Sequence, residues 1–77
     1  MTAKDMFEEL GYKIIENNKN QLTYKIFIWI DDYEVVEKNI TFWLLDKTFE
    51  LDGEFTIKEL QAINKQVEEL GWYDDTN

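Results

Sequence analysis

The segment from Thr56 to Trp72, TIKELQAINKQVEELGW, constrains the fold more than any other part of the chain. Thr56 and Glu59 match the capping box that begins a helix, and Gly71 supplies the left-handed residue at which a helix ends. Apolar residues recur between these signals at spacings of three and four, which places them on one helical stripe: Ile57, Leu60, Ile63, Val67 and Leu70. The sequence therefore predicts an amphipathic helix that needs an apolar surface to pack against.

The preceding residues are predicted to supply that surface. Thr2–Leu10 is typical of a short helix, with Thr2 as its N-cap and Gly11 at its end. Residues 22–30 and 35–45 alternate in polarity with period two and are rich in β-branched and aromatic side chains, which indicates strands. Residues 12–17 and the segment carrying Phe49 and Leu51 are predicted to be two shorter strands.

Short polar connections between these strands favour antiparallel neighbours. We therefore predict a two-layer α+β domain spanning residues 1–77, in which a four-stranded antiparallel meander lies between the two helices in sequence and both helices cover one sheet face. The alternation assigns eight residues to the covered face: Tyr24, Ile26, Ile28, Ile40, Phe42, Leu44, Phe49 and Leu51.

Five residue types are absent from the chain: histidine, cysteine, serine, arginine and proline. Their absence excludes Ser/His and Cys/His nucleophiles, thiolate or imidazole metal sites and disulfides. Catalysis would have to use carboxylates, lysines, tyrosines or threonines, and no carboxylate pair stands out from the many acidic residues. We therefore expect a protein that is not an enzyme and has no cofactor.

The net charge of −9 narrows the choice of partners. An excess of carboxylates repels nucleic-acid backbones and anionic membrane surfaces, so a partner recognised through charge should be a basic protein. We expect neither direct nucleic-acid binding nor membrane binding, and a homo-oligomer is the other partner considered. The apolar runs are of strand length and no signal peptide is apparent, which favours the cytoplasm.

Several segments resemble a group of small acidic proteins encoded by phages and mobile elements of Gram-positive bacteria. They are MFEELGY at 6–12, ITF at 40–42, DKTFE at 46–50 and the helical segment TIKELQAINKQVEELGW. The resemblance covers about half the chain and marks Phe7, Leu10, Gly11, Leu60, Ile63, Leu70, Gly71 and Trp72. It implies a phage or mobile-element origin, and it brings no activity and no site residues.

One segment partly matches the pattern of an EF-hand calcium loop. In Thr48–Glu59 the residues at loop positions three, five, six and twelve are Glu50, Asp52, Gly53 and Glu59. The first position requires a carboxylate but holds Thr48, and the segment before it is predicted to be a strand where an EF-hand has a helix. A calcium loop is therefore only a remote alternative to a strand, a turn and a capped helix.

The other sheet face carries the first candidate interface. If the core face is assigned correctly, Phe27, Trp29, Trp43 and Leu45 lie on the opposite face, where large apolar side chains mark interaction sites. We expect this face to self-associate or to bind a protein partner.

The second candidate is an acidic surface formed by Asp31, Asp32, Glu34 and Glu37. Such a surface is attracted to basic proteins, and a nucleic-acid mimic that inhibits a host DNA-binding or defence protein is the alternative function.

Overall fold

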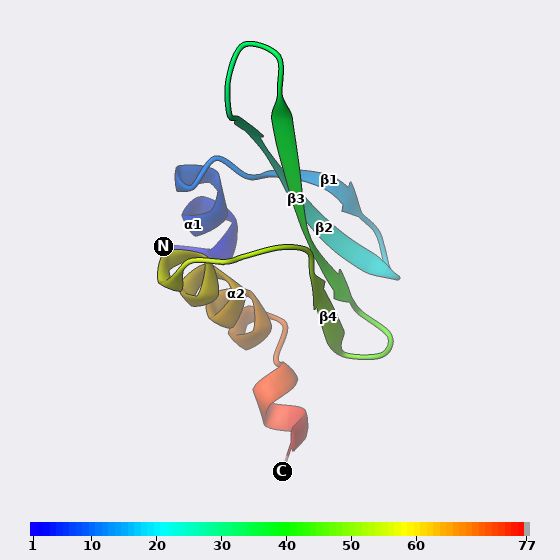
Figure 1. Ribbon diagram of the computed structural model, residues 1–77. Helices are drawn as coiled ribbons and strands as arrows, with labels where there is room; N and C mark the ends of the chain where they lie inside the picture. The colour runs from blue at the N-terminus through cyan, green and yellow to red at the C-terminus, as the bar shows by residue number, and fades with distance from the viewer. Residues whose placement is uncertain (77) are drawn as a thin grey trace. The chain divides into compact units, whose positions relative to one another are not determined.

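The computed structural model describes the backbone from Met1 to Thr76 and the side chains as far as Asp74. Along these described residues, two α-helices, four strands and a short 3-10 helix follow one another (Figure 1). They are α1 (Ala3–Glu9), β1 (Lys13–Asn17), β2 (Gln21–Trp29), β3 (Val35–Trp43), β4 (Thr48–Leu51), α2 (Ile57–Glu69) and η1 (Trp72–Thr76). The predicted α+β class and element order are confirmed.

The chain groups into two compact units. One unit contains the four strands and spans Gly11–Gly53; the other contains the helices and is formed by Met1–Leu10 and the chain from Glu54 onward. The two helices contact each other within their unit. The single domain and the placement of both helices on one sheet face stay predictions.

The sheet is an antiparallel meander with strand order β1-β2-β3-β4. Its longest ladder joins β2 to β3 through nine residue pairs, from Gln21 opposite Trp43 to Trp29 opposite Val35. Both outer strands are shorter: β1 has five residues and β4 has four. The two central strands therefore set the geometry of the sheet.

The middle of the predicted core face is buried. Tyr24, Ile40 and Phe42 are almost completely shielded from solvent, and the rings of Tyr24 and Phe42 meet edge to face with 6.4 Å between centroids. The prediction was wrong for the margins of this face, because Ile28, Phe49 and Leu51 are each about two-fifths exposed. Phe49 and Leu51 belong to an edge strand, which has a neighbour on one side only.

Both helices begin with a capping box, which the sequence predicted for α2, whereas for α1 it predicted Thr2 as the N-cap. In α2 the Glu59 amide donates to the Thr56 hydroxyl and the Thr56 amide donates to the Glu59 carboxylate. Thr2 and Asp5 make the same pair of bonds at α1, and this pairing with Thr2 lowers the pKa of the Asp5 carboxyl. Gly71 has a φ of 75°, as the predicted helix stop requires.

The buried side of α2 is turned from the predicted stripe. Ile57 and Leu60 are mostly exposed, and the buried residues are Glu59, Ala62, Ile63, Gln66 and Val67. Ala62 and Ala3 are completely buried, and alanine allows a neighbouring backbone to approach closely. Glu69 of α2 accepts a 2.8 Å hydrogen bond from the Ala3 amide, which ties the two helices together and places a carboxylate at the N-terminus of α1.

No helix in the described part of the chain is both long enough and apolar enough to cross a membrane.

The α2 cap provides a test of the helical unit. Thr56→Ala removes the oxygen that accepts a hydrogen bond from the Glu59 amide. We expect this variant to lower the free energy of unfolding by about 1 kcal/mol. Thr56→Ser keeps that oxygen and should stay close to wild type in the same denaturant titration. Equal losses in the two variants would contradict the role assigned to the hydroxyl.

Candidate interaction surface

The β2–β3 hairpin extends beyond the strands that flank it. β1 pairs with β2 only from Leu22 to Lys25, and β4 pairs with β3 only from Ile40 to Trp43. The next part of the ladder, from Ile26 opposite Lys38 to Trp29 opposite Val35, is two-stranded within the described chain. We call residues 26–38 the hairpin arm, which comprises these two strand ends and the turn between them. It projects at the top of Figure 1.

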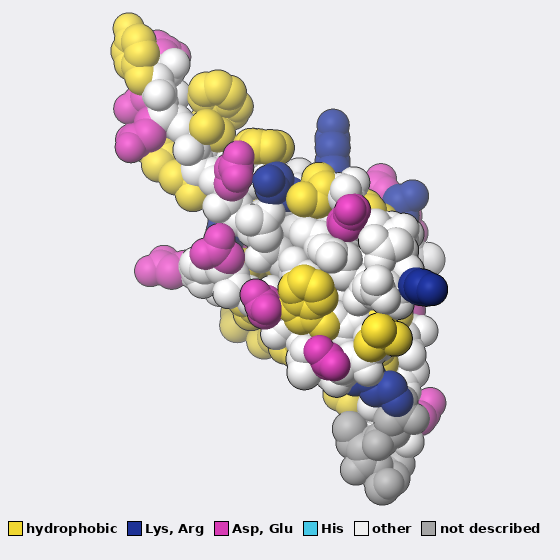
Figure 2. Space-filling view, turned by 90° about the vertical axis from the view of Figure 1, so that its right-hand side faces the viewer, with side chains coloured by type: hydrophobic (Ala, Val, Ile, Leu, Met, Phe, Trp, Pro, Cys, Tyr) yellow, Lys and Arg dark blue, Asp and Glu magenta, His cyan; other side chains and the backbone are white. Residues whose placement is uncertain are grey.

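Both faces of the hairpin arm expose large apolar side chains. Phe27 and Trp29, which share one face, are 56% and 70% exposed. Ile28 and Ile30, on the other face, are 39% and 60% exposed, and Tyr33 in the turn is 97% exposed. Figure 2 shows hydrophobic and acidic side chains gathered on the projecting arm. Two-stranded ribbons are only marginally stable in water, and clustered exposed apolar residues mark interaction sites.

Polar contacts hold the arm together at its base and at its turn. The Lys25 ammonium lies 3.4 Å from a Glu37 carboxylate oxygen and 5.6 Å from the centre of the Phe27 ring. At the other end the Ile30 amide donates to the Glu34 carbonyl, and the Tyr33 amide donates to the Asp31 carboxylate over 2.7 Å. These contacts order the backbone and leave the apolar side chains unshielded.

The structure divides the predicted aromatic interface between two ends of the sheet. Phe27 and Trp29 lie together on the arm, whereas Trp43 lies opposite Gln21 at the far end of the ladder. Trp43 lies eight residues along β3 from Val35, the residue opposite Trp29 (43 − 35). At about 3.3 Å per residue this separation is roughly 26 Å. Trp43 donates to Glu50, and Leu45 is 75% exposed in the following turn. The four residues therefore do not form one patch.

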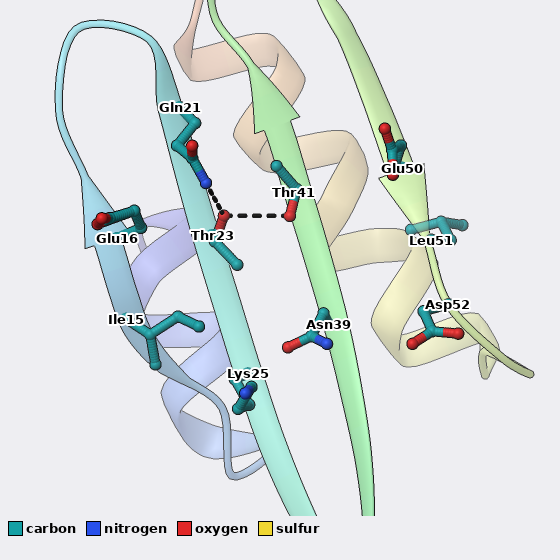
Figure 3. Close-up of a pocket in the computed structure, with 10 residues that line it drawn as sticks. All are labelled: Ile15, Glu16, Gln21, Thr23, Lys25, Asn39, Thr41, Glu50, Leu51 and Asp52. Carbon is teal, nitrogen blue, oxygen red and sulfur yellow. Dashed lines mark hydrogen bonds between the residues drawn. The ribbon is translucent and has the colours of Figure 1, made fainter.

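A polar depression separates these two ends. It has a volume of about 590 Å³ and is lined mainly by polar side chains (Figure 3). Gln21 donates to the Thr23 hydroxyl, which bonds in turn with Thr41 at 3.1 Å. The buried Oδ1 atom of Asn39 has no hydrogen-bond partner among the described residues. The middle of this face is therefore polar and separates the apolar side chains at its two ends.

The hairpin arm also contains apolar residues that sequence reasoning did not assign to a binding surface. Ile28 was assigned to the core because alternation alone cannot distinguish a covered strand segment from an uncovered one. Ile30, Tyr33, Val35 and Val36 were not singled out, although all are exposed on the arm. The unequal predicted lengths of residues 12–17 and 22–30 were the signal that part of the longer strand has no neighbour.

The predicted acidic surface surrounds the tip of the same arm. Asp31, Asp32 and Glu34 are exposed in the turn between β2 and β3. Glu37 lies further along β3 and forms the ion pair with Lys25 described above. The two candidate surfaces of the sequence analysis therefore meet on one structural element, with acidic side chains beside aromatic ones.

The calcium-loop alternative does not fit the structure. Its first four positions form β4, which is paired with β3, and therefore lie in a ladder where an EF-hand has a loop. The carboxylate of Glu59, its last ligand position, is engaged by the Thr56 amide. Among the described residues no group of three acidic side chains is placed to hold a metal ion.

Comparisons with protein-family models, curated proteins and solved structures found no match to this chain.

A matched pair of isoleucines tests whether the arm lies outside the core. Ile40 is completely buried and Ile30 is 60% exposed. We expect Ile40→Val to lower the free energy of unfolding by about 0.5–1.5 kcal/mol, and Ile30→Val to change it by less than about 0.5 kcal/mol. Urea titration at low protein concentration measures both. A loss for Ile30→Val as large as that for Ile40→Val would show that the arm is packed.

Proposed function

We propose that this chain is a non-enzymatic protein-interaction module that binds through its hairpin arm. The observation that carries the proposal is the two-stranded extension of β2 and β3 beyond both flanking strands, with exposed apolar side chains on each face. Tryptophan and tyrosine are frequent binding hot spots, and the arm presents Trp29 and Tyr33. A partner that covers these side chains removes their apolar surface from water, which contributes favourable free energy to binding.

The charges around the arm indicate the chemistry of that partner. Asp31, Asp32 and Glu34 surround the tip, so a partner surface that combines an apolar groove with basic residues at its rim fits it best. Apolar contacts in the centre supply most of the affinity in this account, and the acidic rim contributes orientation and association rate. Burial of aromatic side chains is little affected by salt, whereas contacts of exposed charges are screened.

A nucleic-acid mimic is the second candidate function, and the exposed acidic turn favours it. In that case the carboxylates at the tip, together with the net charge of −9, would occupy a basic channel of a host DNA-binding or defence protein. The resemblance to phage and mobile-element proteins is compatible with a mimic and suggests the cytoplasm of a bacterial host as the setting.

Affinity capture from a bacterial lysate with immobilised protein distinguishes the two functions. We expect wild type to retain a partner at both low and moderate salt, and Trp29→Lys to lose it. Leu45→Lys is the matched control, because Leu45 is 75% exposed, the substitution adds the same charge, and the residue lies outside the arm.

Capture that disappears at moderate salt and is insensitive to Trp29→Lys would favour the mimic. Equal losses for Trp29→Lys and Leu45→Lys would contradict binding through the arm.

A further inference from the structure

The polar depression on the sheet is built from all four strands (Figure 3). The central strands β2 and β3 form its floor, where Thr23 and Thr41 are hydrogen-bonded across the ladder. Residues of β1 form one wall, and residues at the end of β4 form the other. Its volume of about 590 Å³ is in the range of small-ligand sites, and none of its lining residues belongs to the hairpin arm.

A β-bulge shapes the wall formed by β1. The register between β1 and β2 shifts between Ile14 and Glu16, which leaves Ile15 as the extra residue of the bulge. Neighbouring residues of a regular strand point to opposite faces, but Ile15 and Glu16 both line the depression. Bulges redirect side chains in this way and are frequent beside functional sites. The bulge therefore brings the Glu16 carboxylate and an apolar neighbour to the same side of the sheet.

Asn39, on the floor of the depression, does not suit its position for reasons of stability. It lies in β3, a central strand, where asparagine is a poor strand former. Its Oδ1 atom is buried and accepts no hydrogen bond from the described residues. A buried acceptor without a donor destabilises a folded protein, and departures of this kind are expected at functional sites. The requirements of the fold alone therefore do not account for an amide at this position.

The two walls carry negative charge. Glu16 lines one wall, and Glu50 and Asp52 line the other. Lys25 is the one cation among the lining residues, and its ammonium is engaged by the Glu37 carboxylate at 3.4 Å. The carboxylates are divided between the walls, and no group of them within the described chain is placed to hold a metal ion. A ligand that contacts both walls should therefore be positively charged and larger than a metal ion.

We propose that the depression binds the guanidinium group of an arginine side chain presented by a basic partner protein. A guanidinium is planar, always charged and carries five N–H donors, whereas the depression offers mainly hydrogen-bond acceptors. Glu50 lies opposite Thr41, and Figure 3 shows Asp52 next to Asn39, so one planar cation can contact a wall and the floor together. A lysine ammonium is compact and strongly hydrated, and it would meet fewer of these acceptors.

One wall is already ordered for such a contact. The Trp43 indole N–H donates to one oxygen of the Glu50 carboxylate over 2.9 Å, which fixes the side chain and leaves the second oxygen for a ligand. Since the depression lies outside the hairpin arm, this inference does not rest on the proposed function. Loss of binding through Trp29 would leave the depression unaffected, and the two proposals can fail separately.

Titration followed by amide NMR tests the ligand. The probe is acetyl-arginine amide, which presents the side chain as a protein does, and acetyl-citrulline amide is its neutral isostere. We expect the arginine probe to shift the signals of Asn39, Thr41 and Glu50 with a dissociation constant on the order of millimolar, as for a ligand of this size. The citrulline probe should bind at least about tenfold more weakly. Equal binding of the two probes, or no shifts at these residues, would overturn the proposal. Tighter binding of free arginine than of the capped probe would overturn a protein-borne side chain as the ligand.

A matched pair of charge-removing variants separates the site from the net charge of −9. Glu50→Gln removes a wall carboxylate and keeps an oxygen that can accept the Trp43 bond, so we expect it to weaken binding of the arginine probe on the order of tenfold. Glu34→Gln removes the same charge at the exposed tip of the arm and should leave binding unchanged. Equal weakening by the two variants would show a general attraction of cations and overturn the site.

Asn39→Thr tests the orphaned amide. We expect it to weaken binding of the arginine probe at least about tenfold while the midpoint of urea unfolding is not lowered, because threonine is a better strand former and removes the unpaired oxygen. Full binding by this variant, or a lowered unfolding midpoint, would contradict the role assigned to Asn39.

Discussion

The ladder between β2 and β3 is the constraint on which the sheet unit depends. It joins nine residue pairs, whereas β1 and β4 reach only the half that ends at Gln21 and Trp43. That half is the part of a four-stranded sheet that contains the buried residues Tyr24, Ile40 and Phe42. Within the described residues the other half has no neighbouring strand. The same alternating pattern therefore produces a core in one half of the ladder and an exposed arm in the other.

Local patterns predicted the elements of this fold well. The N-cap at Thr2, the capping box at Thr56 and the glycine stops located both helices. Period-two alternation located the two long strands to within two residues at each end. The burial of individual residues could not be predicted in the same way. Ile28 and Ile40 are the same residue type on the same predicted face, and only Ile40 lies within reach of a third strand. That difference depends on long-range pairing, which alternation does not report.

In the helical unit, too, the sequence pattern did not predict which residues are buried. The spacing of Ile57, Leu60 and Ile63 predicts a stripe, but α2 buries Glu59, Ala62 and Gln66 in preference to Ile57 and Leu60. A hydrophobic pattern gives weight to large apolar side chains, whereas close helix packing favours small ones. The candidate surface was only partly predicted, because alternation does not report which strand segments have neighbours. Phe27 and Trp29 lie on the hairpin arm, Trp43 and Leu45 lie outside it, and the exposed Ile28 and Ile30 were not assigned to it.

Residue-resolved amide hydrogen exchange tests the central claim, that the outer edge of β2 is open along the hairpin arm. In dilute protein we expect slow exchange at the amides of Ile28 and Ile30, which point toward β3, and fast exchange at the amides of Phe27 and Trp29, which point outward. Protection of Phe27 and Trp29 equal to that of Ile28 in the dilute monomer would contradict the account.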